Sequence, residues 1–179
     1  EPQGFQVIEE AIFTPEVDLK LLRSKVHFII SRLQLMQKNS TIDRMKPHHI
    51  LLALQTSIIS VATTGITGFD SPAALNSLTD AKDVYQSLLT MLSVKESAFM
   101  DSSLLDEWKN EIDATLTDLD TDFESFDRFH FIINHTNKQF DLWHRTLKDW
   151  GVSIPVELAL KNNATTLFSS NSFNINHFT

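Results

Sequence analysis

An uncharged stretch of twenty residues, Ile50 to Phe69, is the feature that most constrains what this chain can fold into. About half of it is Gln, Ser, Thr or Gly, whereas a membrane-spanning helix is more uniformly apolar. The stretch therefore predicts the central helix of a water-soluble bundle, packed on most sides. It closes on Asp70-Ser71-Pro72, where Ser71 is expected to cap a new helix that begins at Pro72.

Apolar residues recur at steps of three and four along most of the chain, which is the period of amphipathic helices. Pro15 and Pro47 are expected at the first positions of their helices, and Gly151 is expected to end one as a left-handed C-cap. The expected helices are 1–13, 15–39, 47–69, 72–95, 102–123 and 126–150, with a shorter one over 156–168.

The predicted fold is all-α, an antiparallel helical bundle of about six main helices. No segment shows the alternation of a sheet, and the 4 Gly and 5 Pro are too few for the many short turns of an all-β fold. One domain is expected over residues 1–168. Residues 169–179 are polar and are expected to form a C-terminal tail or linker, with Phe173 and Phe178 as isolated anchors.

Composition excludes several classes of function. A net charge of -8 argues against binding to nucleic acid and to anionic membrane surfaces, and membrane insertion is not expected. The absence of Cys removes disulfides, thiolate metal sites, thiol nucleophiles and covalent haem attachment. No signal peptide is visible at the start, but a mature chain would look the same, so this does not decide the compartment. No known catalytic motif names a reaction.

Two groups of polar residues are candidates for a site. His130, Asn137 and His144 lie seven apart and predict a polar edge, which either faces a polar channel or hydrogen-bonds to backbone and water. The segment from Asp101 to Asp127 holds ten acidic residues against Lys109 alone. It is either a solvated helix face or a docking surface for a basic partner, such as an electron-carrier protein.

The first turn carries a resemblance to a known family. Gly4-Phe5-Gln6-Val7-Ile8-Glu9 resembles the GxHxxE motif that opens a helix in imelysin-like proteins. Those are periplasmic or surface helical-bundle proteins linked to iron acquisition, so the resemblance implies metal ligands at Gln6 and Glu9. Gln6 stands where the motif has His, and an amide is a poorer ligand for iron or zinc than an imidazole.

A second stretch, Gly65-Ile66-Thr67-Gly68-Phe69-Asp70-Ser71-Pro72, extends this resemblance. It is similar to the helical region that precedes di-haem cytochrome c peroxidases of Bacteroidetes type. The resemblance implies a non-catalytic docking or structural domain of a periplasmic or cell-envelope protein. Its partners would be its own downstream haem domain or a basic electron carrier, and haem c is expected only in that downstream domain.

Two alternatives stay open. The first alternative to a peroxidase accessory domain is an imelysin-like periplasmic binding protein for iron or another ligand. It would use Glu9, Gln6 and a His of the bundle interior. A helical hydrolase would need a nucleophile and a base, and the spacing of residues specifies no such pair. Enzyme activity is therefore left undecided, with peroxidase activity attributed only to a parent protein.

Overall fold

The structure is a computed structural model that describes residues 4–41, 44–154, 160–161, 163–169 and 171–174. Every named element in these ranges is helical, so the predicted all-α bundle is confirmed. The α-helices are α1 (Phe5–Ile12), α2 (Leu19–Asn39), α3 (Pro47–Ser60), α4 (Ser77–Val94), α5 (Ser102–Asp118), α6 (Arg128–Phe131) and α7 (Asn137–Asp149). Shorter elements are the π-helical turns η2 (Val61–Gly65) and η4 (Ile132–Thr136) and the 3₁₀ turn η3 (Glu96–Ala98). Because η4 joins α6 to α7, the described residues form about six main helices, as expected.

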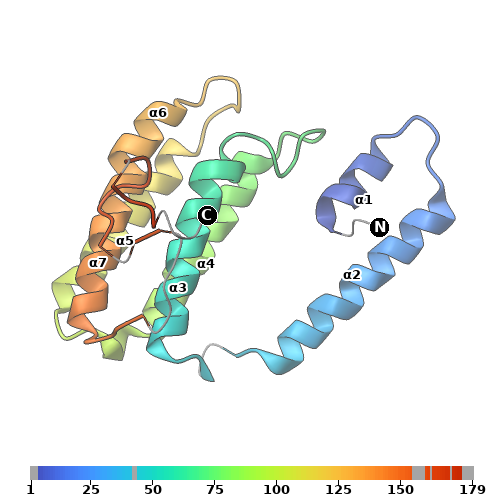
Figure 1. The fold of residues 1–179 in the computed structure, drawn as a ribbon. Coiled ribbons are helices and arrows are strands. Elements are labelled where there is room, and N and C mark those ends of the chain that lie inside the picture. Colours follow the sequence, from blue (N-terminus) through green and yellow to red (C-terminus); the bar gives the residue numbers. More distant parts are fainter. Residues whose placement is uncertain (1–3, 42–43, 155–159, 162, 170, 175–179) are drawn as a thin grey trace.

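The helices form two groups (Figure 1). α3 to α7 pack together into the bundle, with α4 against α5, and α7 against both α5 and α3. α1 and α2 pair with each other in a hairpin, here called the arm (residues 4–39), which stands to one side of the bundle. The hydrophobic core belongs to the bundle and extends from Ile50 to Leu167.

Three helices begin or end elsewhere than the sequence pattern predicts. α2 starts at Leu19 rather than Pro15, because the Asp18 carboxylate accepts hydrogen bonds from the N–H groups of Lys20 and Leu21 and caps the helix there. α5 stops at Asp118, short of the expected residue 123. The central helix does begin at Pro47, but its α-helical part ends at Ser60 and passes into η2.

The expected helix start at Ser71 and Pro72 is also wrong. α4 begins at Ser77, and Leu75 before it adopts a left-handed φ of 54°, which stops the preceding turn from continuing into the helix. The backbone N–H groups of Ala73 and Ala74, which Ser71 would have capped, instead donate to the Glu9 carboxylate of the arm. A long-range contact therefore replaces the local cap.

The turn η4 changes which residues of the last long helix face the core. A continuous helical period predicts Phe129 and Ile133 inside, but these side chains are 75% and 48% exposed. Phe131 is buried instead, whereas Thr136 is buried as the period predicts, because a π-turn holds one residue more than an α-turn and rotates the helix before it relative to the helix after it.

Two glycines adopt the left-handed conformation where the chain requires it. Gly151 has φ 61° and ends the last helix as predicted: its N–H donates to Lys148 O, and the N–H of Val152 donates to Leu147 O. Gly68 has φ 77°, and a Cβ added there would lie 2.7 Å from Cζ of Phe123. Any other residue at this position of the turn after η2 would therefore be strained.

The chain after α7 packs on the bundle without helix in its described part. A helix was expected over 156–168, but Leu160 forms an isolated antiparallel bridge with Phe173, and residues 163–168 are not helical. Residues 155–159 and 162 lie outside the described residues. Leu160, Ala164 and Leu167 are buried. In the expected tail Ser172 is buried and Phe173 packs against the core, so the described part of the tail also lies against the main body.

No helix in the described ranges is long and apolar enough to cross a membrane.

Candidate metal centre

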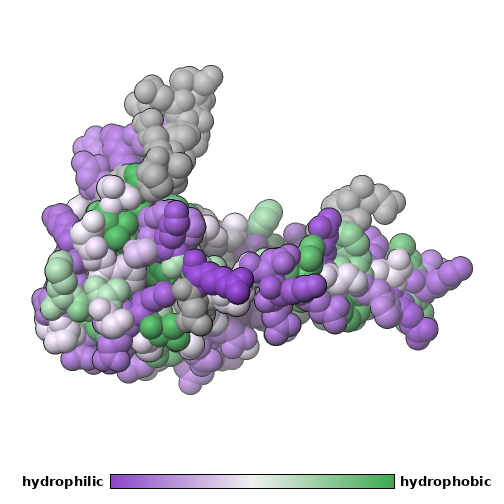
Figure 2. Space-filling model, turned by 90° about the horizontal axis from the view of Figure 1, so that it is seen from below, coloured by the Kyte–Doolittle hydropathy of each residue, from purple (hydrophilic) through white to green (hydrophobic). Residues whose placement is uncertain are grey.

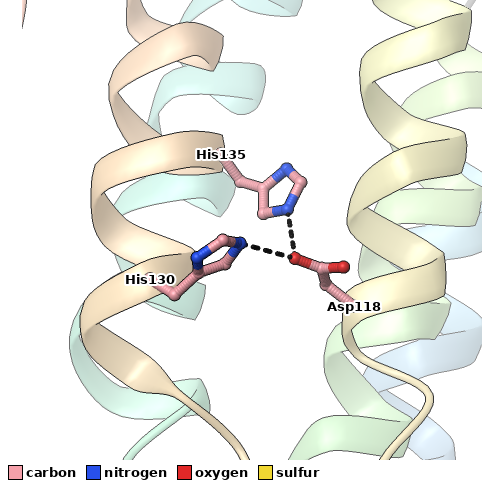
Figure 3. A group of neighbouring side chains, drawn as sticks. All are labelled: Asp118, His130 and His135. Carbon is pink, nitrogen blue, oxygen red and sulfur yellow. Dashed lines mark hydrogen bonds and ion pairs between the residues drawn. The ribbon is translucent and has the colours of Figure 1, made fainter.

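A π-turn brings two histidines of the last long helix to one side. His130 and His135 are five residues apart, and at 100° per residue a regular α-helix would place them about 140° apart. In η4 the N–H of Asn137 instead donates to Ile132 O, five residues back, so the turn contains an extra residue. Both imidazoles consequently point toward the end of α5 (Figure 3). Such π-turns recur at functional sites.

Asp118, the last residue of α5, completes the group. Its Oδ2 lies 2.8 Å from His135 Nε2 and 3.3 Å from His130 Nε2. One ligand atom from each residue lies within 4.8 Å of the others, and no second group of this kind occurs among the described residues. Ligand atoms about 2.1 Å from a tetrahedral metal ion are about 3.4 Å apart, so a small opening of the three side chains would admit one.

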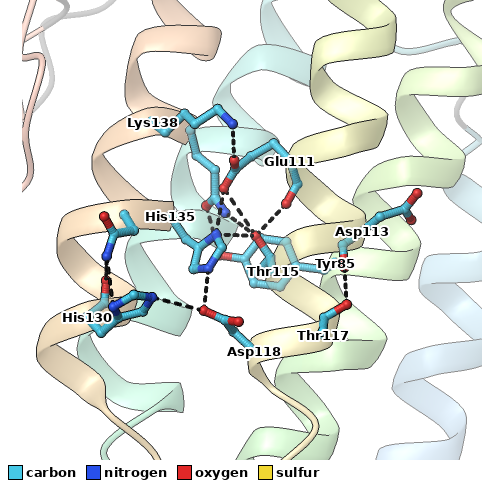
Figure 4. Close-up of polar contacts among 11 residues, drawn as sticks. Tyr85, Glu111, Asp113, Thr115, Thr117, Asp118, His130, His135 and Lys138 are labelled. Carbon is cyan, nitrogen blue, oxygen red and sulfur yellow. Dashed lines mark hydrogen bonds and ion pairs between the residues drawn. The ribbon is translucent and has the colours of Figure 1, made fainter.

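A buried carboxylate orients His135 from behind (Figure 4). Glu111 Oε1 lies 2.8 Å from His135 Nδ1, and the Thr115 hydroxyl lies 3.2 Å from the same nitrogen. The second oxygen of Glu111 is paired with the Lys138 ammonium at 2.8 Å. A carboxylate that accepts from Nδ1–H leaves Nε2 as the ligand atom, which is the usual arrangement around metal-bound histidine.

A chain of buried hydrogen bonds supports this group. Tyr85 donates to Gln139 Oε1, and Gln139 Nε2 donates to the Thr115 hydroxyl, at 2.8 and 2.9 Å. Thr115 in turn donates to the backbone oxygen of Glu111. Residues of α4, α5 and α7 are thereby tied together next to His135, so the position of the ring is set by three helices.

Charges around His135 balance one another. Burial disfavours the imidazolium, but hydrogen bonds to Glu111 and Asp118 outweigh it, and the pKa of His135 is raised. Burial also opposes ionisation of Glu111, yet hydrogen bonds from His135 and Lys138 outweigh it, and the pKa of Glu111 is lowered. The 2.8 Å contact between His135 Nε2 and Asp118 thus lies where a metal cation would be held between the same two groups.

The group is closed toward the core and open toward solvent. The His135 side chain is 8% exposed, whereas Asp118 and His130 are 38% and 55% exposed. The Asn134 amide donates to His130 Nδ1 at 3.0 Å. A metal ion at Nε2 requires this exposed amide to turn so that its oxygen accepts from Nδ1–H.

The residues that the imelysin resemblance implies as ligands lie elsewhere. Gln6 and Glu9 are half-buried on α1, and Glu9 Oε1 accepts from the N–H groups of Ala74 and Ala73 at 2.6 and 3.1 Å. The carboxylate connects the arm to the bundle, and neither residue belongs to the group around His135. Gly4 directly precedes α1.

The second resembling stretch, residues 65–72, forms the turn between η2 and α4. Thr64 donates to the Asp70 carboxylate at 2.8 Å and closes this turn. Phe69 and Pro72 are exposed, whereas Gly68 and Ser71 are buried. These residues shape the backbone where Glu9 binds, which is a structural role.

His130, of the predicted polar edge, contributes to the candidate site, but with a different partner. η4 lies between His130 and the other two residues, and the structure groups His130 with His135 rather than with Asn137 and His144. His144 lies beside the Trp143 ring, with 5.2 Å between centroids. A helical period carried through the π-turn could not indicate His135, and Asp118 and Glu111 stood out only as members of the acidic segment from Asp101 to Asp127.

Comparison with protein-family models, with curated proteins and with solved structures finds no match for this chain.

Proposed function

We propose that this protein binds a divalent transition-metal ion through Asp118, His130 and His135. The observation that carries the proposal is the convergence of two imidazole Nε2 atoms on one carboxylate oxygen, with Glu111 behind the buried ring. Two His and one carboxylate are a ligand set for zinc and for iron(II). The exposed side of the group leaves room for water or a further ligand on the ion.

Metal binding here puts a cation between His135 Nε2 and Asp118, where the two groups are otherwise in hydrogen-bond contact. Asp118 supplies the negative charge, and Glu111 stays hydrogen-bonded to Nδ1 while Lys138 offsets its charge. Thiolate-preferring ions such as copper(I) are disfavoured, because the chain has no Cys.

Titration of Zn²⁺, anaerobic Fe²⁺ and Co²⁺ into the full chain tests this proposal. We expect one ion per chain, with cobalt developing the visible bands of a four- or five-coordinate nitrogen and oxygen site. His130→Ala and Asp118→Asn should each weaken binding by roughly 10–100-fold or more. His27→Ala, which removes an exposed imidazole from α2, is the matched control and should bind normally. An unchanged affinity in His130→Ala, or no binding by the wild type, would overturn the proposal.

A second candidate function is the docking role that the peroxidase resemblance implies, for a downstream haem domain or a basic electron carrier. Asp106, Asp113 and Asp122 are exposed in and beyond α5, which supports a negatively charged surface there. Binding of a basic cytochrome to the full chain, measured at increasing salt, tests it. Docking should weaken with salt and with the triple substitution of these residues by Asn; binding insensitive to both would count against it.

A further inference from the structure

The two helices of the arm differ greatly in length. α2 has 21 residues and α1 has eight, which correspond to about 31 and 12 Å at 1.5 Å per residue. One apolar row on α2 consists of Leu22, Val26, Ile29, Leu33 and Met36. α1 covers only its first half, where Leu22 and Val26 are half-buried and Ile29 is buried. Further along the same row, Leu33 and Met36 are 47% and 63% exposed.

A second apolar row on α2 is also uncovered. Leu21, Phe28 and Leu35 follow one another at steps of seven, and all three are exposed. Green apolar side chains accordingly lie among purple hydrophilic ones along the projecting arm (Figure 2). An apolar surface of this extent on one helix is typical of an interaction site.

The charge of α2 indicates what kind of surface it fits. The helix carries five basic residues and no acidic residue, although the whole chain has a net charge of -8. The basic residues are Lys20, Arg23, Lys25, Arg32 and Lys38. A groove with an apolar base and acidic residues at its edges would complement α2 in both shape and charge.

The bundle has such a surface between α3 and α4. An open groove there has Val61, Ala81 and Val84 among its apolar lining residues, and Asp70 and Asp80 line it as well. Burial, and then the neighbouring carboxylates of Asp83, Glu9 and Asp70, raise the pKa of Asp80. Negative charge is thus crowded beside this groove, and a cation docked there would relieve the repulsion.

The arm of the same chain does not fill this groove in the structure. It is attached at both ends, by the Glu9 hydrogen bonds to Ala73 and Ala74 and by the connection from Asn39 to Pro47 (Figure 1). Closing α2 onto its own α3 and α4 would break the Glu9 contacts. The arm of another molecule meets no such constraint.

We propose that α2 of one copy docks in the α3–α4 groove of a second copy, and that the reciprocal contact forms a two-fold dimer. A two-fold axis makes both contacts equivalent and covers both exposed α2 surfaces at once. An anionic membrane would also attract a basic amphipathic helix, but the acidic bundle next to the arm would be repelled from it.

Sedimentation equilibrium of the full chain tests the dimer. We expect a dimer whose dissociation constant rises with salt, because charged rims are screened. The double variant Leu33→Gln/Met36→Gln should weaken association by about tenfold or more, and Asp80→Asn should weaken it less. Gln34→Ala, at an exposed polar position of the same helix, is the control and should dimerise normally.

A crosslink identifies the partner surface, because the chain has no Cys of its own. In the double variant Leu33→Cys/Thr56→Cys, oxidation should yield a covalent dimer on a non-reducing gel. The pair Gln34→Cys/Thr56→Cys should crosslink far more slowly.

Four outcomes would overturn the proposal. These are a monomeric wild type at its highest soluble concentration, a dimer unaffected by Leu33→Gln/Met36→Gln, an intrachain disulfide, and a monomer that sediments with phosphatidylcholine–phosphatidylserine vesicles. The metal titration described above uses the same chain, but its result does not depend on the oligomeric state. The metal-site proposal and the dimer proposal can therefore fail independently.

Discussion

Glu9 of α1 accepts a 2.6 Å hydrogen bond from the backbone N–H of Ala74, 65 residues later in the chain. A second bond from the N–H of Ala73 makes the carboxylate a cap for the turn before α4. Segments distant in sequence thus satisfy backbone donors that local side chains usually satisfy.

Glu9→Ala should release this turn and the arm together. The N–H groups of Ala73 and Ala74 would turn to water, at a cost of about 1 kcal/mol for the lost charged hydrogen bonds at a partly exposed site. Amide hydrogen exchange at Ala73 and Ala74 should accelerate in the variant. Glu10→Ala, one residue later on the exposed side of α1, should leave both rates unchanged; equal rates in the Glu9 variant would contradict the capping role.

Gly68→Ala should destabilise the bundle. A left-handed alanine alone costs about 1–2 kcal/mol, and its Cβ would press on the Phe123 ring. That ring is held under the Arg128 guanidinium, 4.4 Å from its centroid, so it cannot move away freely. Urea denaturation measures the loss, and Gly65→Ala, where a Cβ meets only ordinary 3.7 Å contacts, should cause none. Equal stability of the two variants would contradict this account of the turn.

Glu111→Gln should lower metal affinity but leave the three residues that bind the ion in place. The amide can still accept from His135 Nδ1–H, but without the charge that makes the ring a better donor to the metal, so affinity should fall roughly 10–100-fold. The cobalt spectrum at saturation should keep its shape. Glu107→Gln, one turn earlier on α5, is the control; an affinity loss equal in both variants would show that Glu111 acts on the helix rather than on the site.

The ion pair between Glu107 and Arg145 should stabilise the folded protein less in acid than at neutral pH. Hydrogen bonds from Arg145 outweigh the opposing effect of burial and lower the pKa of Glu107. A carboxyl group whose pKa is lower in the folded protein contributes stability above its unfolded pKa and loses it as the pH falls through the folded value. Glu107→Gln should therefore cost about 0.2–1 kcal/mol at neutral pH, since the pair is largely open to solvent, and almost nothing near pH 3.

Thermal denaturation at both pH values measures this difference. In an Arg145→Gln background the substitution of Glu107 should have little effect at either pH. A cost that persists in acid would mean that Glu107 contributes through packing rather than charge.

Deletion of Ile133 should convert η4 into a regular α-turn and leave the protein folded. Ile133 is exposed, and the π-turn holds one residue more than an α-turn, so the packing on either side should keep its phase. His130 and His135 would then be four apart in the chain, a spacing that also places two side chains on one helix face. Metal affinity should stay within about tenfold of the wild type.

Deletion of Ala114 from α5 is the matched control for this experiment. No π-turn absorbs that change, so the residues on one side of the deletion would rotate by about 100° and the fold should be lost. Circular dichroism and thermal denaturation distinguish the two deletions. Unfolding of both would contradict the interpretation of η4 as a single-residue insertion.

Local patterns in the sequence predicted the fold well. Apolar periodicity indicated each bundle helix, Pro47 marked the start of α3, and Gly151 ended α7, since these signals depend on a few neighbouring residues. The predicted cap at Ser71 failed because Glu9, 62 positions earlier in the chain, supplies the acceptor. Which of several candidate caps is used depends on tertiary contacts that a single sequence does not display.

The candidate site was predictable only in part. His130 stood out through a seven-residue spacing, yet its partners His135 and Asp118 became visible only with the π-turn in place. A turn that adds one residue breaks the regular period from which helix faces are inferred. Glu111 looked like one member of an acidic surface, and only burial distinguishes it from its solvated neighbours.

Ile29 is the one buried hydrophobic residue of the arm, while the buried hydrophobic residues of the remaining described chain begin at Ile50. Nearly all of the buried hydrophobic residues therefore lie in helices α3 to α7 and in the segment after them. Most substitutions in the arm should therefore leave the fold of the bundle intact, provided that Glu9 still accepts hydrogen bonds from Ala73 and Ala74. The arm is in this sense exchangeable, and proteins sharing this bundle should differ most in the hairpin that precedes it.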